Sequence, residues 1–571
     1  MKKFEPTPQK VSAEYNAGIQ FNQGIQLYDC VATNENFFIG KQWEGVQSNG
    51  LPTPVFNFLK RVVLFSVANV STDNLKLHAS PLPSSGQLTG QDAELLTNIL
   101  NDQFQSIFEF NKMGSCIREF ARNSAVDGDG CLYTYWDPNV ETGQPSKGAI
   151  RTEVLMNTQV LFGNPNNRDV QSQPYIIIER RMMVSEARKR AMANGISEAD
   201  ADAITSDSKN TGSDNRMDEL GGNKVTVLLR LWKDDETGTI HGYECTQSAE
   251  IHEEWDLGIS LYPLSWMSWD FVQDCYHGQA MITGLIPNQI FVNKLFAMSM
   301  ISLMMLAYPK IIYDKTKVAK WSNRVGSAIA VNGSVEHVAE IINPATISPQ
   351  ISEFIDLAIS YTQRFLGASD VALGDTRPDN TSAIIALQRA AATPMELTKQ
   401  TLLQAIEDQG RIYMQFMAEY YGERYIEIPL DNTRKVPALF DFSSLKNYFF
   451  TVDLDVGASS YWSEIASMQT LDNLLMQGKI STVEYLKRLP AGQITDRDTL
   501  IAVLEADQQR QMQMAMAQAG IPSSGEGGQA PSAPASSPNG EEAPPLRGGP
   551  GYGSLQRIIN QTGEVPQERG A

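Results

Sequence analysis

The clearest hydrophobic pattern in the chain predicts one very long helix, from Ser382 to Tyr421. Asn380 and Thr381 supply N-cap side chains, and Pro394 should kink the helix because it lacks a backbone donor and crowds the carbonyl of Ala390. At 1.5 Å per residue, such a helix is on the order of 60 Å long. Its apolar positions keep one face of a 3.6-residue period: Met395, Leu402, Ile406, Tyr413, Met417 and Tyr420.

A second apolar pattern, from Met281 to Tyr308, predicts a helix rich in methionine. Its unbroken apolar run, Leu295 to Tyr308, has only 14 residues, whereas a bilayer needs about 20. We therefore expect no membrane span. The helix should instead be buried on most sides, either in a core or between neighbouring subunits, and we expect it to pack through Met300, Leu303 and Met304.

A β-rich insert, Lys310 to Pro349, separates this helix from another at Ile351 to Leu366. We expect strands at Ile311–Tyr313 and Ala328–Val331, with Asn332-Gly333 as a hairpin turn. The insert opens with a group of basic side chains that suits either an acidic partner surface or passing phosphates, although ordinary solvated lysines are an equal alternative. They are Lys310, Lys315, Lys317, Lys320 and Arg324.

An acidic connector, Gly367 to Asn380, leads into the long helix. It carries Asp370, Asp375 and Asp379 against the single basic residue Arg377, and no apolar run in it is long enough to order it. Arg377 could contact phosphate transiently or form an ion pair inside the loop. The alternative for the whole segment is an exposed loop without a function.

The remaining patterns predict an α+β, mainly helical, multi-domain chain. Helices are expected at Leu27–Asn36, Asn57–Val70, Gln91–Phe110, Met113–Ala125, Ser463–Met476, Thr482–Lys487 and Asp496–Ala519. Strands are expected at Cys131–Trp136, Ile150–Leu155, Tyr175–Glu179, Val225–Trp232, Ile240–Cys245, Ile251–Trp255 and within Phe440–Leu454. Residues 206–223 are expected to be disordered or to form a long surface loop, and the Gly, Pro, Ser and Ala rich stretch 520–571 is expected to be disordered.

Charge, cysteine content and the N-terminal sequence limit the classes of function that the chain could have. The formal net charge of −20 over 571 residues argues against tight, non-specific binding of DNA phosphates, though not against letting DNA pass. Five scattered cysteines suggest reduced thiols in a cytoplasm-like compartment. The start MKKFEPTPQK has no apolar region after its lysines, so we expect no secretory signal.

Patterns for nucleotide hydrolysis and acyl transfer are poorly matched. The two Gly-Lys pairs, Gly40-Lys41 and Gly478-Lys479, lack the following Ser or Thr of a P-loop, and Glu35 and Asn473 occupy the position of its first glycine. No Gly-x-Ser-x-Gly sequence occurs. We therefore expect no catalytic residues, no cofactor and no enzyme activity.

Two metal-binding patterns were also weighed. Asp127 and Asp129 begin like a calcium loop, but Pro138 stands where a bidentate Glu is needed, so a turn between a helix and a strand explains them better. A zinc set without paired spacing is a remote alternative, and we expect no metal. Its members are His241, Cys245, His252, Cys275 and His277.

The order of these elements resembles the portal proteins of tailed double-stranded DNA bacteriophages, of the type that forms dodecameric rings. The matching segments are NENFFIGKQWEG followed by PTPVFNFLKRVV, ARNSAVDGDGCLYTYWDP at Ala121–Pro138, QVLFGNPNNRDVQSQPYII at Gln159–Ile177, and GDTRPDNTSAIIALQRAAATP at Gly374–Pro394. They cover most of residues 27–425 and follow one another around the helix, insert, helix, loop and long-helix arrangement.

The resemblance implies a division of the chain into named parts. These are a wing at 1–280, stem helices at 281–308 and 350–366, a clip at 309–349, a tunnel loop at 367–380, a long kinked helix with a return to the wing at 381–460, and crown helices at 461–519. The tail at 520–571 has no counterpart. Within this scheme Asp370, Asp375, Arg377 and Asp379 would face a channel, and Thr393 with Pro394 would act as a hinge.

The resemblance also implies partners and a location. The chain would form a homo-oligomer of twelve copies at one capsid vertex of the virion, assembled in the host cytoplasm. Double-stranded DNA would pass through it, and it would meet a terminase ATPase, the major capsid or scaffold protein and a tail adaptor, with no membrane. A non-viral scaffold or adaptor with a partner-binding tail is the alternative. The conduit interpretation loses its support if the long helix folds into the interior of its own protomer and the aspartates of the acidic connector point outward.

Overall fold

The protein was analysed as a computed structural model, which describes residues 5–48, 50, 52–71, 75–81, 90–207, 223–307, 310–322, 324, 328–342, 350–365, 395–431, 434–448, 450–456, 461–489, 500–501, 503–504 and 510. Helices and antiparallel sheets make up these residues, so the predicted α+β class is confirmed. The chain divides into two compact units, the first built from residues 1–72 and 76–455 and the second from 73–75 and 456–571.

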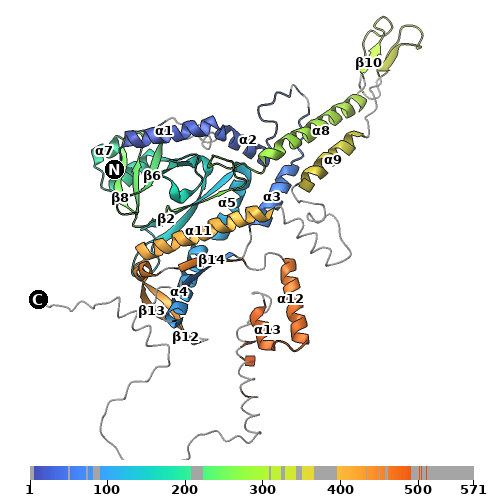
Figure 1. Ribbon diagram of the computed structural model, residues 1–571. Helices are drawn as coiled ribbons and strands as arrows, with labels where there is room; N and C mark the ends of the chain where they lie inside the picture. Colours follow the sequence, from blue (N-terminus) through green and yellow to red (C-terminus); the bar gives the residue numbers. More distant parts are fainter. Residues whose placement is uncertain are drawn as a thin grey trace, which may run out of the picture. The chain divides into compact units, whose positions relative to one another are not determined.

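The largest sheet of the first unit is antiparallel and has the order β4-β5-β6-β7-β8 (Figure 1). Its strands are β4 (Val160–Phe162), β5 (Ile176–Met183), β6 (Lys224–Lys233), β7 (Ile240–Cys245) and β8 (Glu250–Asp256). Helix α1 (Pro8–Gly24) covers one face because Val11 and Tyr15 join the core of the sheet, and the Tyr15 hydroxyl donates to Glu179 at 2.5 Å. Arg230 is buried in β6 and binds the Glu14 carboxylate at 2.7 and 3.2 Å, which satisfies its charge.

A second antiparallel sheet has the order β3-β2-β9. Its strands are β3 (Ala149–Met156), β2 (Asp129–Asp137) and β9 (Leu264–Ser268). Helix α5 (Met113–Asp127) leads directly into β2 through Gly128, whose φ of 105° ends the helix. Gly130, the second residue of β2, has no room for a side chain, since an added Cβ would lie 2.7 Å from Phe120 and Ser124. The helix and the strand are therefore in very close contact at this junction.

Helix α11 (Glu396–Tyr420) packs against this second sheet. The face predicted to be apolar is the buried one, with Leu402, Ile406 and Tyr413 all fully buried. The Tyr413 hydroxyl shares a hydrogen bond of 2.6 Å with Thr152, and Gln409 donates to Thr134. α11 is thus part of the protomer's own core.

This placement changes the interpretation of the long helix. The described part of the predicted helix has 25 residues, about 37 Å in length. Its predicted first part, together with the N-cap pair Asn380 and Thr381, lies outside the described residues, so the full length of forty residues stays a prediction. Because α11 packs against the second sheet of its own protomer, it gives no support to an axial channel. Any such support has to come from other elements.

The predicted strands from Cys131 to Trp255 correspond to β2, β3, β5, β6, β7 and β8. Several elements with weaker patterns were missed: β1 (Leu75–Pro81), β4, α6 (Val184–Ala193), α7 (Glu198–Asp202), β9 and β12 (Glu423–Asp431). Phe440–Leu454 is not continuous strand, because a 3-10 helix, Phe442–Asn447, separates β13 (Arg434–Asp441) from β14 (Phe450–Val456). The Asp441 carboxylate caps that turn by accepting from the Ser443 amide at 2.9 Å.

The other predicted helices of the first unit are present as α2 (Leu27–Ile39), α3 (Phe58–Val70) and α4 (Gly90–Phe110). In the second unit the structure describes α12 (Tyr461–Met476) and α13 (Thr482–Arg488), both at the predicted places. Ser481 caps α13 by accepting from the Glu484 amide at 3.2 Å, and the Tyr485 hydroxyl joins the two helices through Asp472 at 2.6 Å. The tail at 520–571, the loop at 208–222 and most of the predicted helix Asp496–Ala519 lie outside the described residues.

Candidate functional site

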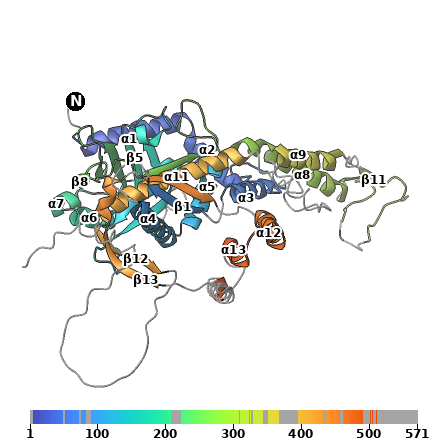
Figure 2. The ribbon, with the colours of Figure 1, turned by 60° about the horizontal axis from the view of Figure 1, so that its bottom comes forward.

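Two helices of the first unit, α8 (Ile286–Ala307) and α9 (Gln350–Phe365), lie side by side (Figures 1 and 2). The end of α8 and the start of α9 are joined through the hairpin of β10 (Lys310–Tyr313) and β11 (Ala339–Ile342). Asn288 donates to the Thr362 hydroxyl at 3.1 Å and links the two helices near the wing. The predicted helix, β-insert and helix arrangement is therefore present.

Helix α8 is apolar but largely uncovered in the protomer. Of its 22 residues, only Gln289, Val292 and Asn293 are buried among those described. The large apolar side chains of its second half are exposed, by 41% for Met300, 58% for Leu303 and 46% for Met304. The prediction that the helix is buried in a core is therefore wrong for the single protomer. Its packing between subunits remains a prediction.

The length argument against a membrane span also needs correction. Thr283–Ala307 forms a helix long and apolar enough to cross a bilayer by length and composition, and 17% of its most apolar window is buried. Length therefore does not separate a membrane helix from a subunit interface. The contacts at the start of the helix are what distinguish these two possibilities.

The start of α8 is fastened to the wing by buried amides. Gln289 donates to the Phe56 carbonyl at 2.8 Å and to the Asn293 side chain at 3.0 Å. Asn293 donates to the Gln42 side chain at 2.6 Å, and Gln42 donates to the Phe37 carbonyl at 3.2 Å. Gln42, Gln289 and Asn293 are all buried, and their hydrogen bonds join α8 to the segment 37–56, which places this part of α8 inside the folded first unit.

The hairpin between the two helices differs from the one predicted. Residues 310–313 pair with 339–342, whereas Ala328–Val331 forms no strand and Asn332-Gly333 is a bend. The residues after Gly333 include Glu336 and His337 and offer no apolar run to pair with Ala328–Val331, so the Asn-Gly signal is overruled. β11 supplies the matching apolar run instead.

The described basic residues lie on this hairpin and its loop. Lys315, Lys320 and Arg324 are exposed, and Lys317 donates to the Glu336 carbonyl at 3.2 Å. Residues 310–342 hold five basic and three acidic side chains, in a chain whose net charge is −20. Tyr313 and Trp321 stack at 5.4 Å beside these cations. The tip is thus a positively charged, partly aromatic surface of the kind that attracts phosphate or acidic protein.

The tunnel-loop and hinge residues cannot be placed against this surface. Asp370, Asp375, Arg377, Asp379, Thr393 and Pro394 all lie outside the described residues.

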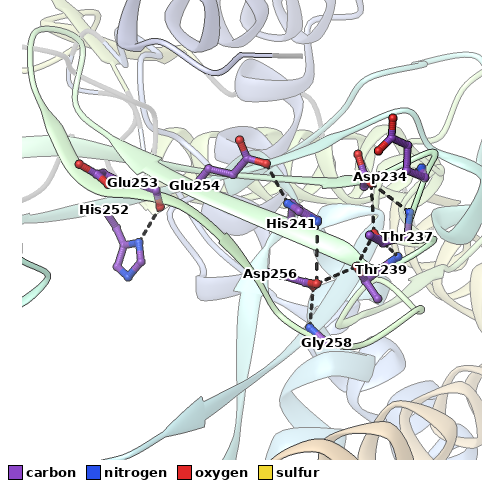
Figure 3. A network of polar contacts seen from close by, with 10 residues as sticks. Asp234, Thr237, Thr239, His241, His252, Glu253, Glu254, Asp256 and Gly258 are labelled. Atoms are coloured by element: carbon purple, nitrogen blue, oxygen red, sulfur yellow. Dashed lines mark hydrogen bonds and ion pairs between the residues drawn. The ribbon is translucent and has the colours of Figure 1, made fainter. Parts of the chain in front are cut away.

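The residues weighed as zinc ligands are not brought together. Burial raises the pKa of the Cys245 thiol to about 12, which opposes the thiolate form that zinc needs. His252 donates to the Glu253 carbonyl at 2.7 Å and lies away from His241 (Figure 3). Within the described part of the chain, no three His, Cys, Asp or Glu side chains are grouped to hold a metal ion.

His241 has a structural role at the edge of the large sheet. Its Nδ1 lies 2.9 Å from Glu254 and its Nε2 lies 3.9 Å from Asp256 (Figure 3). Asp256 in turn accepts from the Thr239 hydroxyl at 3.0 Å and from the Gly258 amide at 2.8 Å. These contacts cross-link β7, β8 and the turn after β8.

Asp129 is fully buried at the start of β2, where sequence reasoning placed a turn. Its carboxylate accepts from the Ser268 hydroxyl at 2.7 Å, the Gly278 amide at 2.7 Å and the His277 ring at 2.9 Å. Because residues 276–278 lie just before the stem, this carboxylate holds the chain that leads into α8. The predicted helix-to-strand turn is confirmed, and the calcium interpretation has no support in this geometry.

The neighbouring carboxyl, Asp127, makes stability depend on pH. Burial raises its pKa to about 7, with Glu35 and Asp129 adding to the rise and Arg122 opposing it. Between about pH 4, the unfolded value, and pH 7 the folded protein keeps a proton that the unfolded chain releases, so stability falls as pH rises through this window. We expect Asp127→Asn to remove that fall, which amounts to at most about 4 kcal/mol.

Urea unfolding at pH 4.5 and pH 7.5 measures this effect. Asp102→Asn, on the exposed face of α4, is the matched control and should retain the fall. A parallel pH dependence in Asp127→Asn and the unsubstituted protein would contradict the assignment.

Sequence reasoning missed the residues that anchor this site. Gln289 and Asn293 precede the apolar run that begins at Leu295, and no role was predicted for them, although their spacing of four residues places both on one helix face. That spacing was the available signal. Nothing in the sequence pairs Asp129 with His277, which are 148 residues apart.

Comparison with known proteins finds a family to which part of the chain is similar. No curated protein matches the chain. Residues 184–440, which run from α6 through α8, the hairpin, α9 and α11 to β13, match the family model of the phage P22-like portal protein. The match supports a phage portal role for the chain. The predicted resemblance is thereby confirmed: across residues 184–440 this chain is similar to the P22-like portal proteins of phages.

Proposed function

We propose that the protein forms a closed dodecameric ring at one vertex of the capsid, through which double-stranded DNA is packaged and ejected. In this proposal α8 and α9 are the stem helices, and residues 310–342 are the clip. The observation that carries it is the apolar surface of α8, which extends around the whole helix.

Four consecutive residues establish this distribution. Leu303, Met304, Met305 and Leu306 are exposed by 58, 46, 52 and 48%. Since successive residues of a helix are about 100° apart, these four side chains point in four directions. One partner surface cannot cover them all. Neighbours on more than one side can, as they do in a ring built from head-to-tail contacts.

Helix α9 supplies a fitting second surface. Phe354, Leu357 and Tyr361 are exposed by 56, 46 and 49% and are spaced so that they form one stripe. An α9 stripe of one copy against the uncovered side of α8 in the next would remove both surfaces from water. The two surfaces differ, so the contact repeats in one direction around a ring instead of closing as a dimer.

The clip fits partners of opposite charge. Its exposed lysines project from a strongly acidic chain, so an acidic surface on a terminase ATPase or a tail adaptor would be attracted to it. The excess of carboxylates elsewhere suits a conduit, because a wall that repels phosphate does not hold DNA in place. Motor force would come from the separate ATPase.

Electron microscopy of the purified protein tests the proposal. Uniform axial rings with a central channel are expected, and their subunit number follows from class averages. A homogeneous monomer at every salt and protein concentration would contradict it and favour a non-viral scaffold. Assembly only in detergent or vesicles would assign α8 to a membrane instead.

The hinge prediction applies to Pro394, which precedes α11. We expect Pro394→Ala to leave ring assembly intact and to impair DNA packaging, because a straightened helix start would restrict movement of the acidic loop. The measurement is a packaging assay with rings of normal appearance. Normal packaging by this variant would remove the hinge role.

A further inference from the structure

The second half of helix α8 has no single apolar face that would define how it packs. This half is apolar on all sides, and much of that surface is methionine, which adapts to many neighbours. Such a helix can rotate or shift along its axis with little change in buried apolar area. Subunits of a closed ring nevertheless need identical stem positions, so something else has to fix the helix.

The amide chain at the wing provides a unique position. It runs from the Phe37 carbonyl through Gln42, Asn293 and Gln289 to the Phe56 carbonyl, and each amide is buried. Each side-chain NH₂ group faces an oxygen acceptor. Because a backbone carbonyl, which can only accept, stands at each end of the chain, the outer amides must turn their NH₂ groups toward those carbonyls. None of the three residues has a buried atom without a partner among the described residues.

A shifted helix could not keep these bonds. Moving α8 by one residue rotates both amides by about 100° away from their partners. Moving it by one turn would present Leu285 or Ala297 where an amide is needed, because the residues four before Gln289 and four after Asn293 are apolar. A half-satisfied buried network is unfavourable, so only one register is retained.

We propose that the Gln42, Asn293 and Gln289 side chains fix the axial and rotational register of α8 on the wing, and thereby the angle at which successive copies meet and the number that closes the ring. These are positioning residues, comparable to a single polar group that sets the register of a coiled coil. The part concerning ring size rests on the proposed function. The part concerning the protomer does not.

Two nearly isosteric substitutions test the register, Gln289→Met and Asn293→Leu. In the unassembled protomer we expect backbone amides 289–297 to exchange hydrogen about tenfold faster, because the buried partners lose their hydrogen bonds. In assembled material we expect several subunit numbers, counted by native mass spectrometry, where the unsubstituted protein has one. Met192→Leu, which changes an exposed methionine of α6 outside the proposed stem, is the control and should change neither readout.

Gln42→Met provides a second route that leaves the sequence of α8 intact, should the first variants fold poorly. It is expected to show the same faster exchange. Unchanged exchange together with an unchanged single ring size in all three variants would overturn the proposal. If the unsubstituted protein forms no rings, the proposed function fails, while the exchange measurement still decides whether the amides hold the helix.

Discussion

Met304→Asp is expected to abolish ring assembly. Met304 is 46% exposed on α8 in the protomer and would be covered by a neighbouring copy in the proposed ring. Burying an unpaired carboxylate there would weaken association by roughly a thousandfold or more, because each contact would carry a cost of several kcal/mol. Since the contact repeats around the ring, the loss should be complete. Size-exclusion chromatography with light scattering measures it.

The matched control is Met192→Asp on α6, where the methionine is 47% exposed. Its exposure and helical setting are the same, but it lies outside the proposed stem, so rings should form normally. Rings formed by Met304→Asp, or lost equally in both variants, would show that α8 does not pack between subunits. Leu303→Asp should behave as Met304→Asp does.

Asp129→Ala is expected to lower the free energy of unfolding by about 3–5 kcal/mol, the cost of removing one partner from a buried charged network. The substitution leaves the Ser268 hydroxyl, the Gly278 amide and the His277 ring without their acceptor. Water cannot replace the carboxylate easily, because Asp129 is 0% exposed and His277 is 3% exposed. Denaturant unfolding followed by circular dichroism gives the value.

Two further variants make this measurement specific. Asp102→Ala, which removes a carboxylate from the exposed face of α4, should change stability little. Asp129→Asn keeps an acceptor oxygen and should lose less than Asp129→Ala. Equal stability of Asp129→Ala and the unsubstituted protein would mean that the network contributes nothing to holding the segment before the stem.

Hydrophobic periodicity was sufficient where one face of an element is consistently buried. The α11 face from Leu402 to Met417 was predicted for this reason. The strands from Cys131 to Trp255, of which β6 and β7 are buried on both faces, were predicted from their runs of apolar and aromatic residues. Elements with short or mixed patterns were not. β4 has three residues, and β11 is a four-residue run that competed with a stronger Asn-Gly turn signal.

The candidate site divides in the same way. Its apolar helix, its basic tip and their order along the chain are properties of local sequence, and they suffice to indicate a portal-like stem and clip. The anchored side of α8 is set by the hydrogen bond between Gln42 and Asn293, residues 251 positions apart. The position of the segment before α8 is set by the hydrogen bond between Asp129 and His277.

Such pairs form only when the wing has folded, because a single amide or carboxylate carries no local preference for a distant partner. The burial of α11 inside its own protomer was decided similarly, by Gln409 meeting Thr134 and Tyr413 meeting Thr152 across the sheet. Local sequence thus determined most of the elements and their order, through burial patterns that repeat every few residues. Tertiary folding determined where those elements are fastened, since hydrogen bonds between distant buried groups become favourable only after water has been excluded from both.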